Sequence, residues 1–187
     1  MDHGHSDGKQ GCCCNATTPI PSVHQTLDEM EFERGIWSAA MNGDLLKVKS
    51  LVAKGTDPGS KDTSGYTALH YAARNGHLEI CTFLLENGAC ANVQTLGGAT
   101  PLQRAALKGH VDIVKILLHF NGNPSICDSD GKTALHKAAE GGHLDVVKIL
   151  IDTDRNLCSV NDNHFRIPAD CVSEKHPEIV NLLRQSC

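Results

Sequence analysis

The sequence predicts a mainly helical protein, a solenoid of about five helix-turn-helix units joined by short hairpin-like fingers. Three observations support this fold class. The segment from Thr67 to His77 returns at Thr100 and again at Thr133, so the chain repeats at a constant interval. Each copy places leucine and paired alanines at helical spacing. Weaker matches one period earlier and one period later extend the same register over roughly residues 32–187.

The first half of each unit reads as a short helix that ends at a glycine. Thr100 can cap such a helix through its side-chain oxygen, and Pro101 suits the first helical position because its missing N–H costs nothing there. Leu102 and Ala105 lie three residues apart on one buried face, and Gly109 supplies the left-handed residue that ends a helix. The equivalent residues of the flanking units are Thr67, Gly76, Thr133 and Gly142.

The second half of each unit predicts another helix followed by a turn. Val111 and Leu117 belong to the apolar stripe of this helix in the middle unit. Gly88 ends the equivalent helix one unit earlier, and Asn121 takes that place here because asparagine tolerates a positive φ better than other side chains do. Residues 94–99 then form a turn-rich finger. No unit can bury its apolar faces alone, so neighbouring units must stack into one continuous core.

Two regions are expected. Residues 1–21 form a flexible N-terminal tail, because their composition is polar and contains glycine. Residues 22–187 form the repeat domain, and its outer units are degenerate, as terminal caps of a solenoid are. The expected units are about 32–63, 64–96, 97–129, 130–162 and 163–187.

Histidines recur at two places in each unit. His70 and His136 follow the Thr-x-Leu pattern, where Gln103 stands in the middle unit. His77, His110 and His143 follow the glycine that ends the first helix of their units. Recurrence once in each repeat spreads these side chains along the solenoid and does not bring them to one point. We therefore expect them to make hydrogen bonds between adjacent units and not to bind a metal or carry out acid–base chemistry.

The pattern Thr-Pro-Leu-His-x-Ala-Ala-x-x-Gly-His, followed by paired leucines and Gly88-Ala89, resembles the ankyrin repeat. This resemblance implies an ankyrin-repeat solenoid whose first helices and fingers line a concave side. It also implies a non-enzymatic adaptor or scaffold that binds a protein partner there. Tyr66 and Leu96 are the expected anchors, because aromatic and apolar contacts concentrate binding energy. If the variable positions of the family transfer, the partner-binding residues are Met30, Met41, Asn42, Thr63, Ser64, Tyr66, Arg74, Asn75, Leu96, Ala99, Leu107, Lys108, Ser129, Asp130, Lys132 and Glu140.

The same resemblance suggests one modification site. Asn92 stands where ankyrin repeats often carry an asparagine that a hydroxylase can modify. The sister positions hold Ser125 and Cys158, so at most one unit has this residue.

The N-terminal tail suggests an alternative function. It carries thiol and imidazole side chains that are suitable zinc ligands, although three adjacent cysteines fit a single tetrahedral ion poorly. A metal- or redox-responsive adaptor, acylation of the clustered cysteines, and a chemically passive tail are the interpretations left open. The residues concerned are His3, His5, Cys12, Cys13 and Cys14.

Composition argues against several classes of protein. The net charge is -5, and residues 1–31 hold five acidic side chains against one lysine, so the remainder is nearly neutral and lacks the basic footprint of a nucleic-acid binder. No apolar run is long enough to span a membrane, and no signal peptide is visible. With nine scattered cysteines, we expect reduced thiols in a cytoplasmic or nuclear monomer. No cofactor fingerprint or nucleophile–base set indicates an enzyme.

Overall fold

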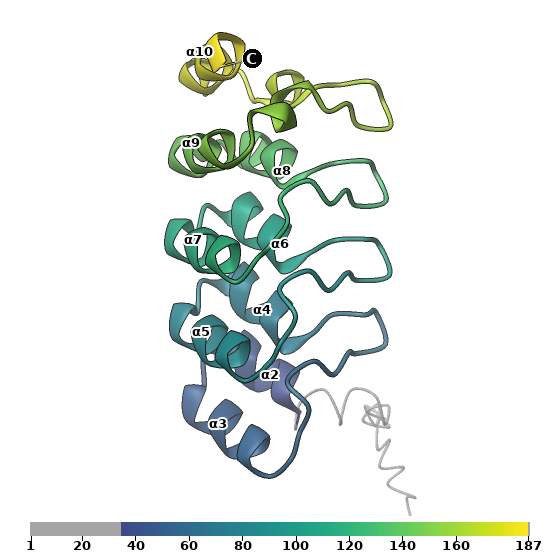
Figure 1. Ribbon diagram of the computed structural model, residues 1–187, viewed down its shortest axis with the longest axis vertical. Helices are drawn as coiled ribbons and strands as arrows, with labels where there is room; N and C mark the ends of the chain where they lie inside the picture. Colours follow the sequence, from purple (N-terminus) through teal and green to yellow (C-terminus); the bar gives the residue numbers. More distant parts are fainter. Residues whose placement is uncertain (1–34, 187) are drawn as a thin grey trace, which may run out of the picture.

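The computed structural model describes residues 35–186, which form a stack of short helices (Figure 1). The predicted tail of residues 1–21 and the candidate Met30 lie outside the described residues. Within them the helices are, in chain order, α2 Ile36–Met41, α3 Leu45–Ala53, α4 Ala68–Asn75, α5 Leu78–Glu86, α6 Pro101–Lys108, α7 Val111–His119, α8 Ala134–Gly141, α9 Leu144–Thr153, the 3₁₀ helices η1 Arg155–Ser159 and η2 Pro168–Cys171, and α10 Pro177–Ser186.

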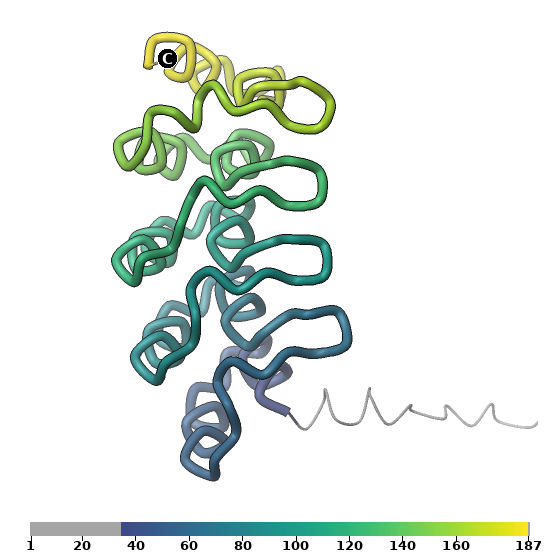
Figure 2. The backbone as a smooth tube through the Cα atoms, turned by 45° about the vertical axis from the view of Figure 1, so that its right-hand side comes forward, coloured from purple at the N-terminus to yellow at the C-terminus, as the bar shows by residue number. Residues whose placement is uncertain are grey.

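The helices are arranged in two columns beside a row of fingers. Helices α2, α4, α6 and α8 form the column next to the fingers, and α3, α5, α7 and α9 form the outer column (Figures 1 and 2). Contacts run mainly between neighbours, from α2 to α4, from α4 to α6 and from α6 to α8. The predicted helical solenoid, in which each unit rests on the next, is confirmed.

The core lies between the two columns and continues through the stack. In the inner column the paired alanines Ala72–Ala73, Ala105–Ala106 and Ala138–Ala139 are fully buried. Their small size lets successive inner helices approach closely. Leucines at the centre of each layer, Leu69, Leu102, Leu135, Leu84, Leu117 and Leu150, fill the space between the columns.

The predicted helix ends at glycine and asparagine are confirmed, and the predicted threonine cap is confirmed at Thr100. The side chain of Thr100 accepts a hydrogen bond from the Gln103 N–H at the start of α6, at 3.3 Å. Gly76, Gly109 and Gly142 end the inner helices with φ values of 85°, 74° and 73°. Asn121 has a φ of 60° where Gly88 has 90°. The capping residue at the start and the positive-φ residue at the end therefore set the length of each helix.

The last unit departs from the predicted helix-turn-helix pattern. Its first helix is a single 3₁₀ turn, η2, in place of a helix of eight residues such as α8. The sequence explains the difference, because Val172 and Ser173 stand where the paired alanines would be and Asp170 replaces the recurring histidine. The Asp170 carboxylate accepts a hydrogen bond from the Ile167 N–H at the start of its own turn. Within the described residues no finger follows this turn, so the bond to a next finger that the recurring histidines make has no counterpart here.

The fingers are loops 62–66, 95–99, 128–132 and 162–166, each built on the side chain of its first residue. In the first finger, Asp62 Oδ1 accepts hydrogen bonds from the N–H groups of Ser64 and Tyr66, at 2.9 and 2.8 Å. Asp128 and Asp162 repeat these two bonds in their own fingers. Such side-chain turns stabilise a tight loop without a ladder, and residues 35–186 contain one isolated β-bridge and no strands.

Neighbouring fingers are also hydrogen-bonded to one another. Leu96 N–H donates to the Ser64 carbonyl at 3.1 Å, and Ser129 N–H donates to the Gly97 carbonyl at 2.9 Å. The third and fourth fingers are joined by Asn163 N–H and the Asp130 carbonyl, at 2.9 Å. The row of fingers is therefore a connected frame.

The fourth finger carries a phenylalanine where the other three have glycine. Gly65, Gly98 and Gly131 all have positive φ, and a Cβ on Gly65 would lie 2.8 Å from the backbone nitrogen of Leu96 in the next finger. Phe165 has a φ of 59° and is 88% exposed. The helices η2 and α10, and not another finger, follow it. An aromatic side chain therefore fits here in space, although its backbone conformation is unfavourable.

Replacing Phe165 by glycine is expected to raise the free energy of unfolding by about 0.5–1 kcal/mol. The left-handed conformation costs an L-residue about 1–2 kcal/mol, which the greater freedom of glycine in the unfolded chain partly offsets. Denaturant titration measures the change. The control is Phe165→Ala, which removes the ring but keeps the unfavourable φ. An equal gain from alanine would show that ring exposure, and not backbone conformation, is the cause.

Candidate functional site

The first set of recurring histidines joins each inner helix to the next finger. His70 is buried; its Nδ1 accepts the Thr67 N–H at 3.1 Å and its Nε2 donates to the Ala99 carbonyl at 3.0 Å. Burial lowers the pKa of His70 to about 4, so the ring is neutral at physiological pH, with its proton on Nε2. His136 repeats the arrangement with Thr133 and the Arg166 carbonyl.

Glutamine makes the same connection in the middle unit. Gln103 Oε1 accepts the Thr100 N–H at 3.1 Å, and its Nε2 donates to the Lys132 carbonyl at 2.9 Å. The amide thus supplies one acceptor and one donor at the positions that Nδ1 and Nε2 of histidine supply elsewhere. This position therefore requires a neutral side chain that carries both a hydrogen-bond acceptor and a hydrogen-bond donor.

The second set of histidines connects each unit to the one before it. His77 Nε2 donates to the Met41 carbonyl at 3.0 Å, and His110 Nε2 donates to the Arg74 carbonyl at 3.1 Å. His143 makes the same bond to the Leu107 carbonyl at 3.0 Å. The predicted role of the recurring histidines in hydrogen bonds between units is confirmed for both sets.

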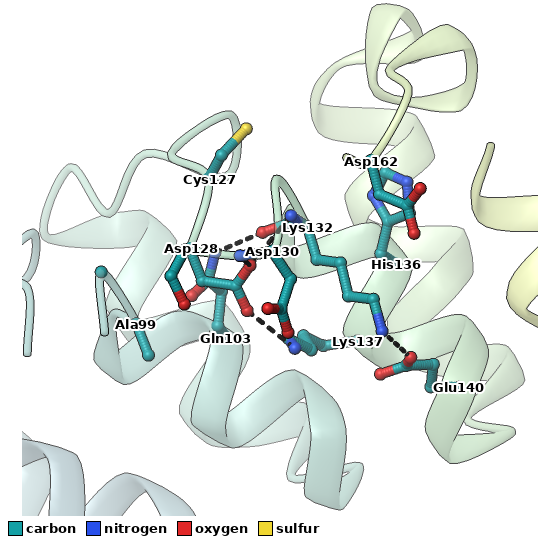
Figure 3. Close-up of polar contacts among 12 residues, drawn as sticks. Ala99, Gln103, Cys127, Asp128, Asp130, Lys132, His136, Lys137, Glu140 and Asp162 are labelled. Carbon is teal, nitrogen blue, oxygen red and sulfur yellow. Dashed lines mark hydrogen bonds and ion pairs between the residues drawn. The ribbon is translucent and has the colours of Figure 1, made fainter. Parts of the chain in front are cut away.

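The fingers and the inner helices together form one surface of the stack. We call it the finger–helix face and define it by loops 62–66, 95–99 and 128–132 and by the solvent-facing sides of α4, α6 and α8. It contains the elements that the family resemblance assigns to a concave side. At its centre is a cavity of about 230 Å³, between the second and third fingers and helices α6 and α8 (Figure 3). Its lining includes Gln103, Arg104, Leu107, Ser129, Asp130 and Lys137.

One end of this cavity meets an aromatic and polar cluster. The Arg104 guanidinium donates a hydrogen bond to the Tyr66 hydroxyl and lies 5.2 Å from the centre of the Tyr66 ring. The Tyr66 ring in turn lies 5.4 Å from that of Tyr71, whose hydroxyl donates to Asp62 Oδ2 at 2.6 Å. Burial and this hydrogen bond raise the pKa of Tyr71. Tyr66, a predicted anchor, is thus held in place by neighbouring side chains.

Two ion pairs lie on the same face, both visible in Figure 3, and Lys137 and Asp128 of the first pair line the cavity. Lys137 Nζ lies 2.7 Å from Asp128 Oδ2, and Lys132 pairs with Glu140. The Glu140 carboxylate raises the pKa of Lys132, against the opposing effect of burial. Asp128 also holds its finger through Oδ1, so this residue connects loop geometry to the charge of the inner helix.

Most of the predicted partner-binding residues that the structure describes lie on or beside the finger–helix face. Leu96 is 82% exposed on the second finger, and Thr63, Ser64, Ser129 and Asp130 are exposed on the neighbouring ones. Arg74, Asn75, Leu107 and Lys108 lie at the C-terminal ends of α4 and α6, and Met41 and Asn42 extend the set to the end of α2. Lys132 and Glu140 are the ion pair already described.

Ala99 is only 6% exposed, and it belongs to the lining of the central cavity. Its role in partner binding stays a prediction. The residue lies where the second finger turns into α6, and its carbonyl accepts the hydrogen bond from His70. Through this bond the Ala99 backbone helps to fix the second finger on the inner helices.

Three residues that line the face are absent from the predicted set. Tyr71, Arg104 and Lys137 each follow directly after the histidine or glutamine of the Thr-x-Leu pattern. A signal for them is present in the sequence, because this position recurs once in each repeat and differs in every unit. The residue before it is histidine or glutamine and the residue after it is alanine in all three units, whereas the position itself varies.

The Asn92 side chain bridges two units. Its Nδ2 donates to the Asn121 carbonyl at 2.8 Å, and its Oδ1 accepts the Asn123 N–H at 2.7 Å. The amide is engaged in the structure at both ends, and hydroxylation of this residue stays a prediction.

The N-terminal metal candidates His3, His5, Cys12, Cys13 and Cys14 lie outside the described residues, and the metal- or redox-responsive alternative stays a prediction. Among residues 35–186, no three histidine, cysteine or acidic side chains form a group that could hold a metal ion. The same part of the chain has no helix of the length and hydropathy needed to cross a bilayer.

Stacked helix pairs with a row of fingers define the class of ankyrin-type repeat solenoids. The family model for ankyrin repeats, in three copies, matches residues 36–125 and 120–187, so the chain belongs to the ankyrin-repeat family. Proteins of this family are protein-interaction modules.

The chain is similar to ankyrin repeat domain-containing protein 39 of Bos taurus, with 62% identity over 63 residues, or 34% of each chain. The Homo sapiens protein of that name is 59% identical over the same length and share. The matched segment thus spans about a third of these relatives. A segment of 45 residues, 24% of this chain, is 47% identical to 6% of the potassium channel KOR2 of Oryza sativa subsp. japonica.

Proposed function

We propose that the protein is a non-enzymatic adaptor that binds a protein partner on the finger–helix face, as a monomer in the cytoplasm or the nucleus. The observation that carries this proposal is the combination of a row of exposed fingertip residues with the hydrogen bonds that hold the fingers in place. Each finger is fixed by its own aspartate or threonine and by the neighbouring finger. A surface ordered before binding loses little conformational entropy when the partner arrives.

The recurring polar residues support a non-enzymatic role. His70 uses both ring nitrogens in hydrogen bonds to the backbone, and Gln103 uses both ends of its amide in the same way. A general base needs a lone pair that can reach a substrate. These side chains have their hydrogen-bonding capacity committed to joining units, which fits a binding scaffold.

The proposal can be tested with paired variants on opposite sides of the stack. Leu96→Glu with Ser129→Arg changes two exposed fingertips, and Leu46→Glu with Ser50→Arg makes the same changes on the exposed side of α3. Crosslinking mass spectrometry of affinity-purified protein identifies partners that crosslink to the face. Their affinity is expected to fall at least about 10-fold for the fingertip pair, which is roughly 1.4 kcal/mol, and to be unchanged for the α3 pair.

Equal retention of every partner by the two double variants would contradict the proposal. Circular dichroism melting of each variant controls for loss of fold. None of the four side chains is buried, so all variants are expected to melt close to the parent protein.

A further inference from the structure

We propose that the finger–helix face recognises an acidic, extended polypeptide segment, and that one carboxylate of this segment pairs with Arg104 in the central cavity. The inference rests on the proposed function and adds the chemistry of the partner to it. Three features carry it: the unpaired cations of the face, a buried donor of Arg104 without an acceptor, and the position of Arg104 in the lining of the central cavity.

The positive charges of the face are unequally compensated. Lys132 and Lys137 are paired with Glu140 and Asp128. Within residues 35–186, by contrast, Arg74, Arg104 and Lys108 form no ion pair. Two further acidic residues lie on the face. Asp62 is occupied by the Tyr71 hydroxyl and two N–H groups of its own loop, and Asp130 is exposed on the third finger.

The three unpaired cations are neighbours in the fold. Arg104 and Lys108 lie four residues apart on α6 and so share one side of that helix. Arg74 lies in the last turn of α4, which packs against α6. A polypeptide crossing from one unit to the next would meet all three charges in succession, so a run of acidic side chains matches this part of the surface better than an isolated one.

Arg104 also has unused hydrogen-bonding capacity. Its Nε is buried and has no hydrogen-bond partner among the described residues, while another guanidinium nitrogen donates to Tyr66. A guanidinium carries five donors in a planar fork that matches a carboxylate, and a buried donor left without an acceptor is unfavourable. A carboxylate in the adjoining cavity would supply acceptors for this fork and a counter-charge together.

A polypeptide fits these observations better than a nucleic acid. The paired acids Asp128 and Glu140 and the exposed Asp130 lie on the same face as the three unpaired cations. A phosphate backbone, which carries charge at every residue, would meet these carboxylates. An acidic peptide can place its carboxylates at the cations and neutral residues opposite Asp130.

The experiment uses the full chain and a fluorescein-labelled peptide of alternating glutamate and glycine, followed by fluorescence anisotropy at low salt. The matching glutamine–glycine and lysine–glycine peptides are controls for charge, and a labelled oligothymidylate is the nucleic-acid control. The glutamate peptide is expected to bind at least about 10-fold more tightly than each control, and to weaken as salt rises.

Four variants assign the binding to the proposed residues. Arg104→Gln and Lys108→Gln are each expected to weaken the glutamate peptide at least about 5-fold, and Lys115→Gln on the exposed side of α7 to leave it unchanged. Arg104→Lys keeps the charge but loses the fork, so its affinity is expected to lie between those of the parent protein and Arg104→Gln. Because Lys108 is exposed, Lys108→Gln stays informative even if Arg104→Gln destabilises the fold.

Three results would overturn the inference: equal affinity for the glutamate and glutamine peptides, tighter binding of oligothymidylate, or parent-like affinity of both Arg104→Gln and Lys108→Gln. The fingertip variants of the preceding section leave Arg74, Arg104 and Lys108 in place. If they release a crosslinked partner while the glutamate peptide does not bind, the proposed function stands and the acidic chemistry of the partner is wrong.

Discussion

Replacing His70 by leucine is expected to lower the free energy of unfolding by about 3 kcal/mol. Leucine has similar bulk but leaves the Thr67 N–H without the acceptor at 3.1 Å and removes a donor from the Ala99 carbonyl. Each buried polar group that loses its partner costs roughly 1–3 kcal/mol. Both groups lie where one unit meets the next, so the loss also weakens the contact between units. Urea titration at neutral pH measures the change.

The chain itself provides the matched control. Gln103 makes the equivalent bonds in the middle unit, so His70→Gln is expected to stay within about 1 kcal/mol of the parent protein. If glutamine and leucine destabilise equally, the hydrogen bonds are not the reason that this position is polar.

Comparing His70→Gln with the parent protein also isolates the contribution of His70 to the pH dependence of stability. The pKa of His70 is lowered from 6.5 to about 4 in the folded protein, so between these values the unfolded chain binds a proton that the folded chain does not. Stability is therefore lost as pH falls through this window, by about 3 kcal/mol in full. His70→Gln removes this contribution, so its stability should decline less between pH 7 and about pH 4 than that of the parent protein.

Replacing Gly109 by alanine is expected to cost about 3 kcal/mol. The residue has a φ of 74°, and a Cβ there would lie 2.4 Å from Nδ1 of His143. The left-handed conformation alone costs about 1–2 kcal/mol. The His143 ring must also move, which disturbs its hydrogen bond to the Leu107 carbonyl. Thermal and urea unfolding both report the loss.

Gly88→Ala separates the two contributions. Gly88 has a φ of 90°, and a Cβ there would have no heavy atom within 4 Å. This variant is expected to lose only the conformational part, about 1 kcal/mol. Equal losses at the two positions would show that close packing against the histidine contributes nothing.

The sequence predicts those parts of the fold that depend on local chemistry. Thr100, Gly109 and Asn121 have roles set by their own backbone conformation or by a residue within one turn, and a single unit is enough to recognise them. The recurring histidines are predictable for another reason. The constant interval between repeats places each copy against the same part of the neighbouring unit, so hydrogen bonds between units follow from the repeat.

The remaining features depend on which side chains meet across units. Whether a lysine is paired depends on a partner elsewhere, as Lys137 with Asp128 and Lys132 with Glu140 show. The unpaired charge of Arg104 is therefore visible only in three dimensions. The low exposure of Ala99, 6%, is likewise not visible in the sequence, because a variable position in the repeat does not reveal how deeply a small side chain lies.

Phe165 bears on how this chain could be lengthened. Solenoids grow by duplication of whole units, and a copied unit inserted after the fourth finger would run its loop through the space beside residue 165, as its counterparts do beside Gly65, Gly98 and Gly131. An aromatic side chain obstructs that path. An engineer who adds a repeat at this end would first have to restore glycine there, whereas an extra copy placed among the earlier units would meet no such obstacle.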